Sequence, residues 1–239
     1  MTCSTKLDRT QAPTFWGVQR KSEHLAPNTS PGSHPKALSI PLTVLIRDVL
    51  KLAKTAKEVR TAIIDIGVIV DGVPRRNPNF PVGLMDVLEM PSLGKAFRLV
   101  STKARTLYPI EVTEDEKNLK LCAIKNKVLV RKNMFQYVMH DGRSILTGPE
   151  VNMSVSDSVL IEVPSQKIVK HVAMKKGSIV MVTGGERQGE VGTLNAIKLG
   201  TVTRPRMASV EINGNNVEIP AKLVMAVGDN KPVVAISVS

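Results

Sequence analysis

Two short helical patterns follow one another almost without a linker between residues 39 and 67, and this close succession strongly constrains the fold. Ser39 and Pro41 suit the start of the first helix, because proline in a first turn removes no helical hydrogen bond. Apolar side chains then recur at the spacing of one helix face, at Leu42, Leu45, Val49 and Leu52. The pattern predicts a compact pair of packed helices.

The second helix has a strong start signal. Thr55 and Glu58 have the spacing of a capping box, in which the threonine hydroxyl and the glutamate carboxylate satisfy backbone N–H groups that lack helical partners. Gly67 supplies a stop. Its predicted apolar face consists of Val59, Ile63 and Ile66.

Lysine and arginine side chains accompany this helix pair. Arg47, Lys51 and Lys54 recur at i, i+4 and i+7, which predicts a basic stripe on the first helix. Lys57 and Arg60 lie outside the apolar face of the second helix. Such a stripe can be merely a solvated face. We favour a phosphate-binding face, because the stripe lies in the most positively charged part of the chain.

A hairpin is predicted directly after the helices. Asp71-Gly72 separates residues 68–70 from residues 73–76, and the type I′ turn needs positive φ at both central residues, which Asp-Gly pairs tolerate. Arg75 and Arg76 follow this turn, so we expect them near the helix ends as part of the same phosphate-binding face. Residues 80–88 predict a further turn and strand.

The net charge of +12 and the sequence pI of about 9.9 indicate an anionic partner. Basic residues outnumber acidic ones by ten to four in residues 1–60, six to four in 61–110, nine to eight in 111–170 and eight to five in 171–239. Half of the excess lies in the first quarter of the chain. Aromatic residues are only 3%, which favours contacts to phosphate and groove shape over stacking on single-stranded bases.

Residues 1–38 are rich in Pro, Gly and polar residues and have no hydrophobic periodicity. We interpret them as an extended arm that is pinned at Phe15-Trp16, with Trp16, Arg20 and Lys21 on RNA. The alternative is an unstructured tail with one aromatic side chain tucked under the next domain.

Residues 94–172 predict a strand-rich unit, with β-branched or aromatic runs at 128–130, 135–139 and 159–163. Thr113 and Glu116 repeat the capping-box spacing, so the acidic run 114–116 predicts a solvated helix of one or two turns. A carboxylate metal site would need converging ligands from elsewhere, and the sequence indicates none.

His140-Asp141-Gly142-Arg143 is open to two interpretations. It could belong to an active site, but the sequence has no recognised nucleophile elbow to accompany it. The simpler interpretation is a hairpin turn between residues 135–139 and 144–147, with Arg143 exposed and free to contact RNA.

Residues 173–239 predict several short strands, including a hairpin around Asn213-Gly214, which suggests a small twisted sheet or barrel. The glycine cluster at 184–192 lacks the Gly-Lys-Ser/Thr of a nucleotide-binding loop. We interpret it as tight turns between strands. Candidate RNA-backbone contacts in this region are Lys175, Lys176, Arg187, Arg204 and Arg206.

Cys3 and Cys122 lack the spacing of a metal site or a disulfide framework, and we expect two thiols in a reducing compartment. No apolar run approaches the roughly 18 residues of a membrane helix, and no signal-peptide core is evident. We therefore expect a soluble, cytoplasmic protein.

Ordered motifs across most of the chain resemble those of the ribosomal protein S4e family of archaea and eukaryotes, and the short length resembles the archaeal form. They are Ala12-Pro13 with Phe15-Trp16, Pro31-Gly32 with His34, residues 39–56, 70–76 and 80–87, Lys120-Leu121-Cys122, residues 140–143 and residues 181–185.

The resemblance implies an α+β, multidomain protein. Its parts would be an N-terminal arm (1–38), an αL-type RNA-binding domain (39–93), a central β-rich domain (94–172) and a KOW-type SH3-like barrel (173–239). It implies a structural constituent of the small ribosomal subunit that binds folded rRNA beside neighbouring ribosomal proteins. No catalysis, cofactor, metal, membrane or homo-oligomer is expected. Alternatives are an RNA-modifying enzyme with an αL domain, tested by uridine conversion, and a KOW-type transcription factor, tested by co-purification with RNA polymerase.

Overall fold

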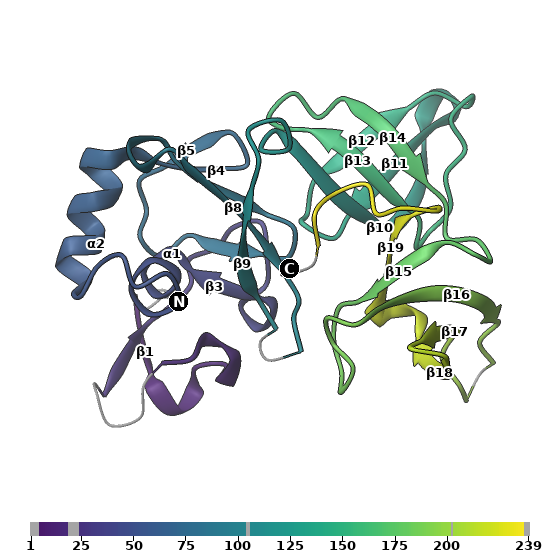
Figure 1. Ribbon diagram of the computed structural model, residues 1–239. Coiled ribbons are helices and arrows are strands. Elements are labelled where there is room, and N and C mark those ends of the chain that lie inside the picture. Colours follow the sequence, from purple (N-terminus) through teal and green to yellow (C-terminus); the bar gives the residue numbers. More distant parts are fainter. Residues whose placement is uncertain (1–4, 19–23, 104–105, 202, 237–239) are drawn as a thin grey trace. The chain divides into compact units, whose positions relative to one another are not determined.

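The computed structural model describes residues 5–18, 24–103, 106–201 and 203–236, and it is rich in β-strands with few helices (Figure 1). The chain divides into two compact units. The first, here unit 1, comprises Met1–Val100 and Leu107–Asn118, and the second, unit 2, comprises Ser101–Thr106 and Leu119–Ser239.

Unit 1 is built on an antiparallel sheet with the strand order β5-β4-β7-β8-β9, beside the smaller pairs β1-β2 and β3-β6. Its helices are α1 (Leu42–Val44) and α2 (Ala56–Ala62), each continued by a π-helical turn, Leu45–Val49 and Ile63–Gly67. Its strands are β1 (Lys6–Asp8), β2 (Leu25–Pro27), β3 (Ser39–Pro41), β4 (Val68–Val70), β5 (Val73–Arg75), β6 (Pro81–Gly83), β7 (Val87–Met90), β8 (Lys95–Val100) and β9 (Tyr108–Val112).

The predicted first helix is much shorter in the structure. It ends at Val49, and Lys51 has φ 56°, in the left-handed region that non-glycine residues rarely adopt. The inferred stripe of Arg47, Lys51 and Lys54 on one helix is therefore wrong. Leu52, predicted on its apolar face, is 50% exposed. The chain turns away after Leu50 to start α2, so helical spacing no longer applies to these side chains.

The second helix forms as predicted. The Thr55 hydroxyl accepts a hydrogen bond from the Glu58 N–H at 3.2 Å, and the Glu58 carboxylate accepts from the Lys54 and Thr55 N–H groups at 2.8 and 3.4 Å. Gly67, with φ 73°, ends the helical segment. The Asp71-Gly72 hairpin also forms, with φ 52° and 72° between β4 and β5.

The Trp16 side chain anchors the N-terminal arm to the core of unit 1. Trp16 is fully buried in the core formed with Ile40, Leu42 and Leu45, and its Nε1–H donates to the Ser39 carbonyl at 2.8 Å. The predicted extended arm includes the strand pair β1-β2 and 3-10 turns. The observed arm combines the two interpretations, since it is partly regular and has its aromatic side chain tucked under the helices.

A buried histidine fastens the end of this arm. The His34 Nε2 lies 2.9 Å from Asp86 Oδ1, and both side chains are buried. The other Asp86 oxygen accepts from the Gly83 N–H at 2.9 Å. A Cβ on Gly83 would lie 2.4 Å from the His34 ring, so this position requires glycine.

The helix predicted at residues 113–116 is absent, and residues 114–118 form a turn. The capping-box spacing fails here because Glu116 has another partner. Its Oε2 accepts from Arg98 Nη1 at 2.8 Å and its carbonyl accepts from Arg98 Nη2 at 3.0 Å, so the guanidinium of a buried strand residue holds the turn.

Unit 2 contains, in its described residues, two five-stranded antiparallel sheets with the orders β12-β11-β10-β13-β14 and β18-β17-β16-β15-β19. The strands are β10 (Leu119–Val130), β11 (Met134–Met139), β12 (Ser144–Thr147), β13 (Ser158–Glu162), β14 (Ile168–Val172), β15 (Ile179–Val182), β16 (Val191–Lys198), β17 (Met207–Ile212), β18 (Asn215–Pro220) and β19 (Val224–Gly228).

Two of the expected domain boundaries can be compared with the observed sheets. The expected boundary after residue 93 falls within the sheet of unit 1, because β7 pairs with β8 and β8 with β9. The expected boundary after residue 172 falls between the two sheets of unit 2.

Both predicted hairpins of unit 2 form, around Asp141-Gly142 and Asn213-Gly214. The prediction that Arg143 is exposed was wrong. Asp141 is buried and pairs with the buried Lys120 ammonium at 2.9 Å and with Arg143 Nε at 3.2 Å. Burial alone would raise the pKa of Asp141, but Lys120 and His140 outweigh it and hold that pKa below the ordinary value of 3.8.

We predict that Trp16→Ala lowers the free energy of unfolding by about 3–5 kcal/mol, because a large buried side chain leaves a cavity and the Ser39 carbonyl loses its donor. Denaturant unfolding followed by circular dichroism measures this loss. Phe15→Ala, at a partly buried neighbour, serves as the control and should cost less. A loss below about 1 kcal/mol for Trp16→Ala would show that the arm does not depend on the indole.

The Asp141 pair predicts a dependence on pH. Since the folded-state pKa of Asp141 is lowered, its contribution to stability is present above the ordinary value of 3.8 and is lost as the pH falls through the folded pKa. Asp141→Asn should destabilise the protein at neutral pH by about 3–5 kcal/mol, because Lys120 remains buried without its carboxylate.

The stability of Asp141→Asn should also fall less than that of the unmodified protein as the pH is lowered below about 4. Urea titrations at several pH values test both points. Asp115→Asn, at an exposed aspartate, is the matched control. Equal acid sensitivity of Asp141→Asn and the unmodified protein would contradict the prediction.

Candidate nucleic-acid interface

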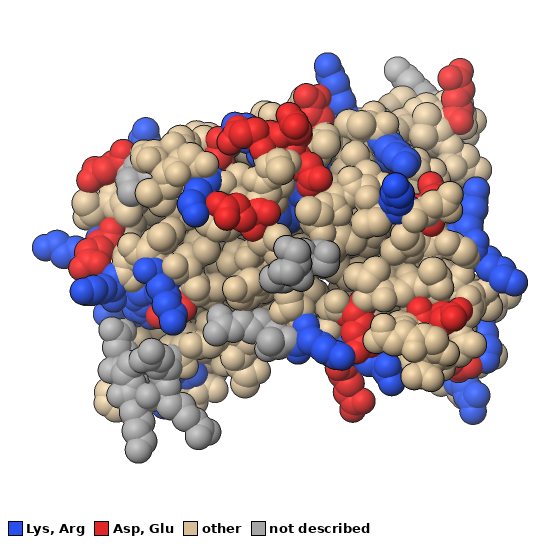
Figure 2. All heavy atoms as spheres, in the orientation of Figure 1, with Lys and Arg blue, Asp and Glu red and all other residues tan. Residues whose placement is uncertain are grey.

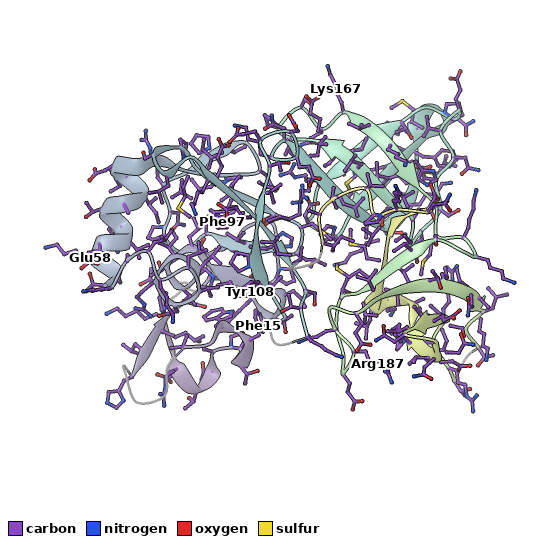
Figure 3. All side chains as sticks on the ribbon, viewed as in Figure 1. Phe15, Glu58, Phe97, Tyr108, Lys167 and Arg187 are labelled. Atoms are coloured by element: carbon purple, nitrogen blue, oxygen red, sulfur yellow. The ribbon has the colours of Figure 1, made fainter. Side chains whose placement is uncertain are left out.

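Four exposed cations surround the start of α2 and form what we call the α2 cation cluster: Lys51, Lys54, Lys57 and Arg60. Lys51 and Lys54 lie in the segment before the helix, and Lys57 and Arg60 are three residues apart on it, so they share a face. None of the four makes an ion pair with a carboxylate of a described residue. Figure 2 shows Lys and Arg side chains gathered around the lower end of α2, and Figure 3 labels Glu58 at that end.

The acid nearest to the cluster is engaged by the backbone. The Lys54 N–H bond to the Glu58 carboxylate is the main reason that the pKa of Glu58 is lowered, and the Thr55 N–H and hydroxyl and the Lys54 charge add to it. The carboxylate therefore stays ionised as a helix cap. It reduces the positive potential at Lys54 without forming an ion pair with the lysine ammonium group.

A second acid lies along the helix. Glu58 and Asp65 line a shallow groove on α2 together with Lys57, Thr55, Thr61 and Ala62. The groove itself thus carries mixed charge. Of the α2 cation cluster, Lys57 lines this groove, whereas Lys51, Lys54 and Arg60 do not.

The structure removes Arg47 from the predicted phosphate-binding face. Its Nε and Nη2 donate to the two carboxylate oxygens of Asp48 at 3.0 and 2.9 Å, and the arginine side chain is only 13% exposed. This two-bond pairing of neighbours occupies the planar guanidinium. Sequence spacing could not reveal it, because side chains at i and i+1 point in different directions on a regular helix.

Arg75, the last residue of β5, and Arg76, which follows it, differ from each other. The Arg75 guanidinium lies 4.3 Å from the centroid of the Phe80 ring and is partly buried, while Arg76 is exposed. Stacking on an aromatic ring leaves the positive charge in place and orients the side chain. The β5 strand lies against the Ile63–Gly67 turn, as expected for residues close to the end of the second helix.

The predicted RNA contacts also include Trp16, Arg143, Arg20 and Lys21. Trp16 is fully buried and cannot stack on a base. Arg143 is partly buried beside Asp141, and its side chain is 18% exposed. Arg20 and Lys21 lie outside the described residues.

The five other cations predicted in unit 2 are exposed, but they lie at both ends of one sheet. Lys175 and Lys176 precede β15, and Arg204 and Arg206 lie between β16 and β17. Because β15 and β16 are antiparallel, these two segments share an end. Arg187, between β15 and β16, lies at the opposite end, where its Nη1 is 3.5 Å from Glu190 Oε2.

Sequence reasoning missed other exposed cations. They have no motif around them, and they include four that make no ion pair with a described residue: Lys125, Lys167, Lys170 and Lys222. The buried Lys120 was also missed as half of an ion pair. A sequence signal could have revealed this burial. Lys120 lies two residues before Cys122 in a strand, so both side chains are on the same, inward face of the sheet.

Comparison with known proteins gives consistent matches. The sequence model of ribosomal family S4e matches residues 93–168. The small ribosomal subunit protein eS4 of Methanothermobacter thermautotrophicus is 33% identical over 231 residues, which cover 96% of this chain and 95% of that protein. The protein of the same name from Archaeoglobus fulgidus is 36% identical over 233 residues, covering 96% of this chain and 97% of that one.

A solved structure agrees. The crystal structure of the 30S ribosomal protein S4e from Thermoplasma acidophilum matches with a TM-score of 0.70 and 27% identity, over 80% of this chain and 96% of that chain. The matches extend over nearly the full length of each relative, so they indicate common descent of whole proteins and place the chain in a family of ribosomal proteins. The chain belongs to the ribosomal S4e family, as its motifs indicated.

A membrane-spanning helix is not found in the described residues, where no helix combines the necessary length with the necessary apolar character.

The left-handed conformation of Lys51 gives a stability prediction. Its φ of 56° costs a non-glycine residue roughly 1–2 kcal/mol, and glycine avoids this cost. Lys51→Gly should therefore be about 1 kcal/mol more stable than Lys51→Ala, which removes the same charge but keeps the strain. Chemical unfolding of both variants measures the difference. Equal stabilities would show that the turn before α2 is unstrained.

Proposed function

We propose that this chain is a structural constituent of the small ribosomal subunit that binds folded rRNA mainly through phosphate contacts. The observation that carries the proposal is the α2 cation cluster, whose side chains are exposed and make no ion pair with a described carboxylate, in a member of the ribosomal S4e family. The cytoplasmic ribosome and neighbouring ribosomal proteins follow as its location and partners, and the role is non-catalytic.

The chemistry of the surface supports phosphate contacts over base reading. All seven aromatic residues lie in the described part of the chain, and of these only Tyr108 is exposed, at 38%. Stacking platforms for splayed bases need exposed rings. Flexible lysines and arginines on a rigid helix and its flanks suit a folded RNA backbone, whose position they fix without reading sequence.

The finer architecture is part of the proposal. The helix pair with the β4-β5 hairpin would be the αL-type RNA-binding domain, and the β18-β17-β16-β15-β19 sheet would be the KOW-type SH3-like barrel. Exposed Arg76, Lys175, Lys176, Arg187, Arg204 and Arg206 would add contacts to those of the α2 cation cluster. Arg20 and Lys21 stay within the proposal as contacts of the arm, whereas Trp16 and Arg143 would act by supporting the fold.

The proposal predicts that the triple variant Lys54→Gln, Lys57→Gln, Arg60→Gln binds small-subunit rRNA more weakly and with less dependence on salt. Each lost phosphate contact should reduce the slope of log K against log salt concentration by about one, because fewer counterions are released. Filter binding of the purified full chain to small-subunit rRNA, over a series of salt concentrations, measures both quantities.

The matched control removes three exposed cations from unit 2, by Lys167→Gln, Lys170→Gln and Lys222→Gln. Both variants lose the same net charge, so a general electrostatic effect would lower the two slopes equally. A smaller slope for the α2 variant alone supports a local contact surface. An unchanged slope for the α2 variant would place the contact elsewhere on the protein.

A further inference from the structure

One face of the β10-β11-β12 part of unit 2 carries no charge and is mostly apolar, although part of it is exposed to solvent. Directly paired residues of antiparallel strands share a face. The pairing therefore places on one side, here called the outer face, Asn126, Val128, Val130, Met134, Gln136, Val138, Ser144 and Leu146. No charged residue is among these eight, and Val128 is 43% and Leu146 is 55% exposed.

The opposite face of the same strands is where the core lies. Tyr137, Met139 and Ile124 belong to its apolar cluster, and the loop between β12 and β13 covers it through Met153. Tyr137 and Lys127 both bond to that loop. An antiparallel sheet with one covered face normally presents polar side chains on the other. The outer face departs from this rule.

The same side of the sheet continues into a region that is buried within unit 2. Leu121 and Leu160 share this side of the sheet, beyond the irregularity between Ile124 and Asn126, and both are buried. In that half of the sheet β19 lies against β10, β13 and β14. One apolar side of the sheet is thus covered over half its extent, and the half formed by β10, β11 and β12 is left open.

Two further features indicate what kind of partner could cover the open half of this face. Lys125 precedes the exposed stretch of β10 and Arg131 follows it, both are exposed, and neither makes an ion pair with a described carboxylate. Strand β12 stands at the end of the strand order, so its outer backbone edge lacks a partner strand among the described residues. Apolar side chains offer nothing to phosphate groups, which argues against RNA on this face.

We infer that the outer face is the docking surface for a neighbouring protein whose contact segment presents apolar side chains flanked by carboxylates. The apolar side chains would cover Val128 and Leu146, and the carboxylates would meet Lys125 and Arg131. This inference rests on the proposed function, because it seeks the partner within the small subunit. It adds a protein-binding surface that is separate from the phosphate-binding cations.

The test replaces Leu146 with the photoreactive amino acid p-benzoylphenylalanine in the full chain. The variant is expressed in the organism from which the protein comes, so that it can assemble with its natural partners. Small subunits are isolated on a sucrose gradient and irradiated, and the crosslinked partner is identified by mass spectrometry. We expect one protein, crosslinked through a segment that contains apolar residues and Asp or Glu. Adding Val128→Glu should lower the crosslink yield about tenfold, since it places a carboxylate in the contact.

Val169→Glu is the matched control for this change. Val169 is 56% exposed on β14, at the other edge of the same sheet, and the crosslink yield should be unchanged. Circular dichroism of both glutamate variants checks that the fold is retained. An equal loss of yield in the two variants would overturn the inference.

The remaining outcomes separate the inference from the proposed function. If the protein is absent from the small-subunit fractions, the proposed function fails and the inference fails with it. If the protein is present but position 146 crosslinks to rRNA, to a second copy of this chain or to nothing, the inference alone is overturned.

Discussion

The capping box at the start of α2 is the interaction on which the candidate interface depends. It commits the Glu58 carboxylate to the N–H groups of Lys54 and Thr55, and so it both begins the helix and withholds the nearest acid from ion pairing. If Glu58 faced outward instead, it could neutralise Lys54 or Lys57. The lowered pKa of Glu58 expresses the same preference for the ionised, backbone-bound state. The positive charge around α2 therefore remains available to an external anion.

Charge elsewhere in the protein is used differently. Arg98 holds the 114–118 turn through Glu116, Lys120 meets Asp141 in the interior, and Arg47 is paired with its neighbour Asp48. Removing one member of a buried pair leaves a charge without compensation, so such residues respond to mutation through stability. Exposed cations act through long-range, salt-dependent attraction. The net charge of +12 is therefore a poor guide to which cations can reach RNA.

The surface divides by chemistry in a way that suits a protein within a large ribonucleoprotein. The exposed cations around α2 suit contacts to phosphate groups, whereas the outer face of β10, β11 and β12 presents uncharged and mostly apolar side chains. An RNA backbone and a protein neighbour demand these different surfaces, since one is a polyanion and the other buries apolar area. Trp16 contributes to neither, because it anchors the arm to the helices from within the core.

Sequence alone determined the features that depend on neighbours along the chain. The capping box, the glycine that ends the second helix and the Asp-Gly and Asn-Gly hairpins follow from local hydrogen bonding and allowed φ values. The family was also evident from ordered motifs. These features locate the second helix and the hairpins β4-β5, β11-β12 and β17-β18, and they place Lys57 and Arg60 on α2.

Only the tertiary structure decided which of the candidate side chains are free. Arg47 pairs with the adjacent Asp48 and Arg143 with Asp141 two residues away, and neither contact follows from helix or strand periodicity. The burial of Trp16 comes from contacts with residues distant in the sequence. The missing helix at residues 114–116 has the same cause, because an arginine on a distant strand binds the glutamate that would have capped it. Local rules specify where backbone donors are satisfied, while packing specifies which charges and apolar faces remain for a partner.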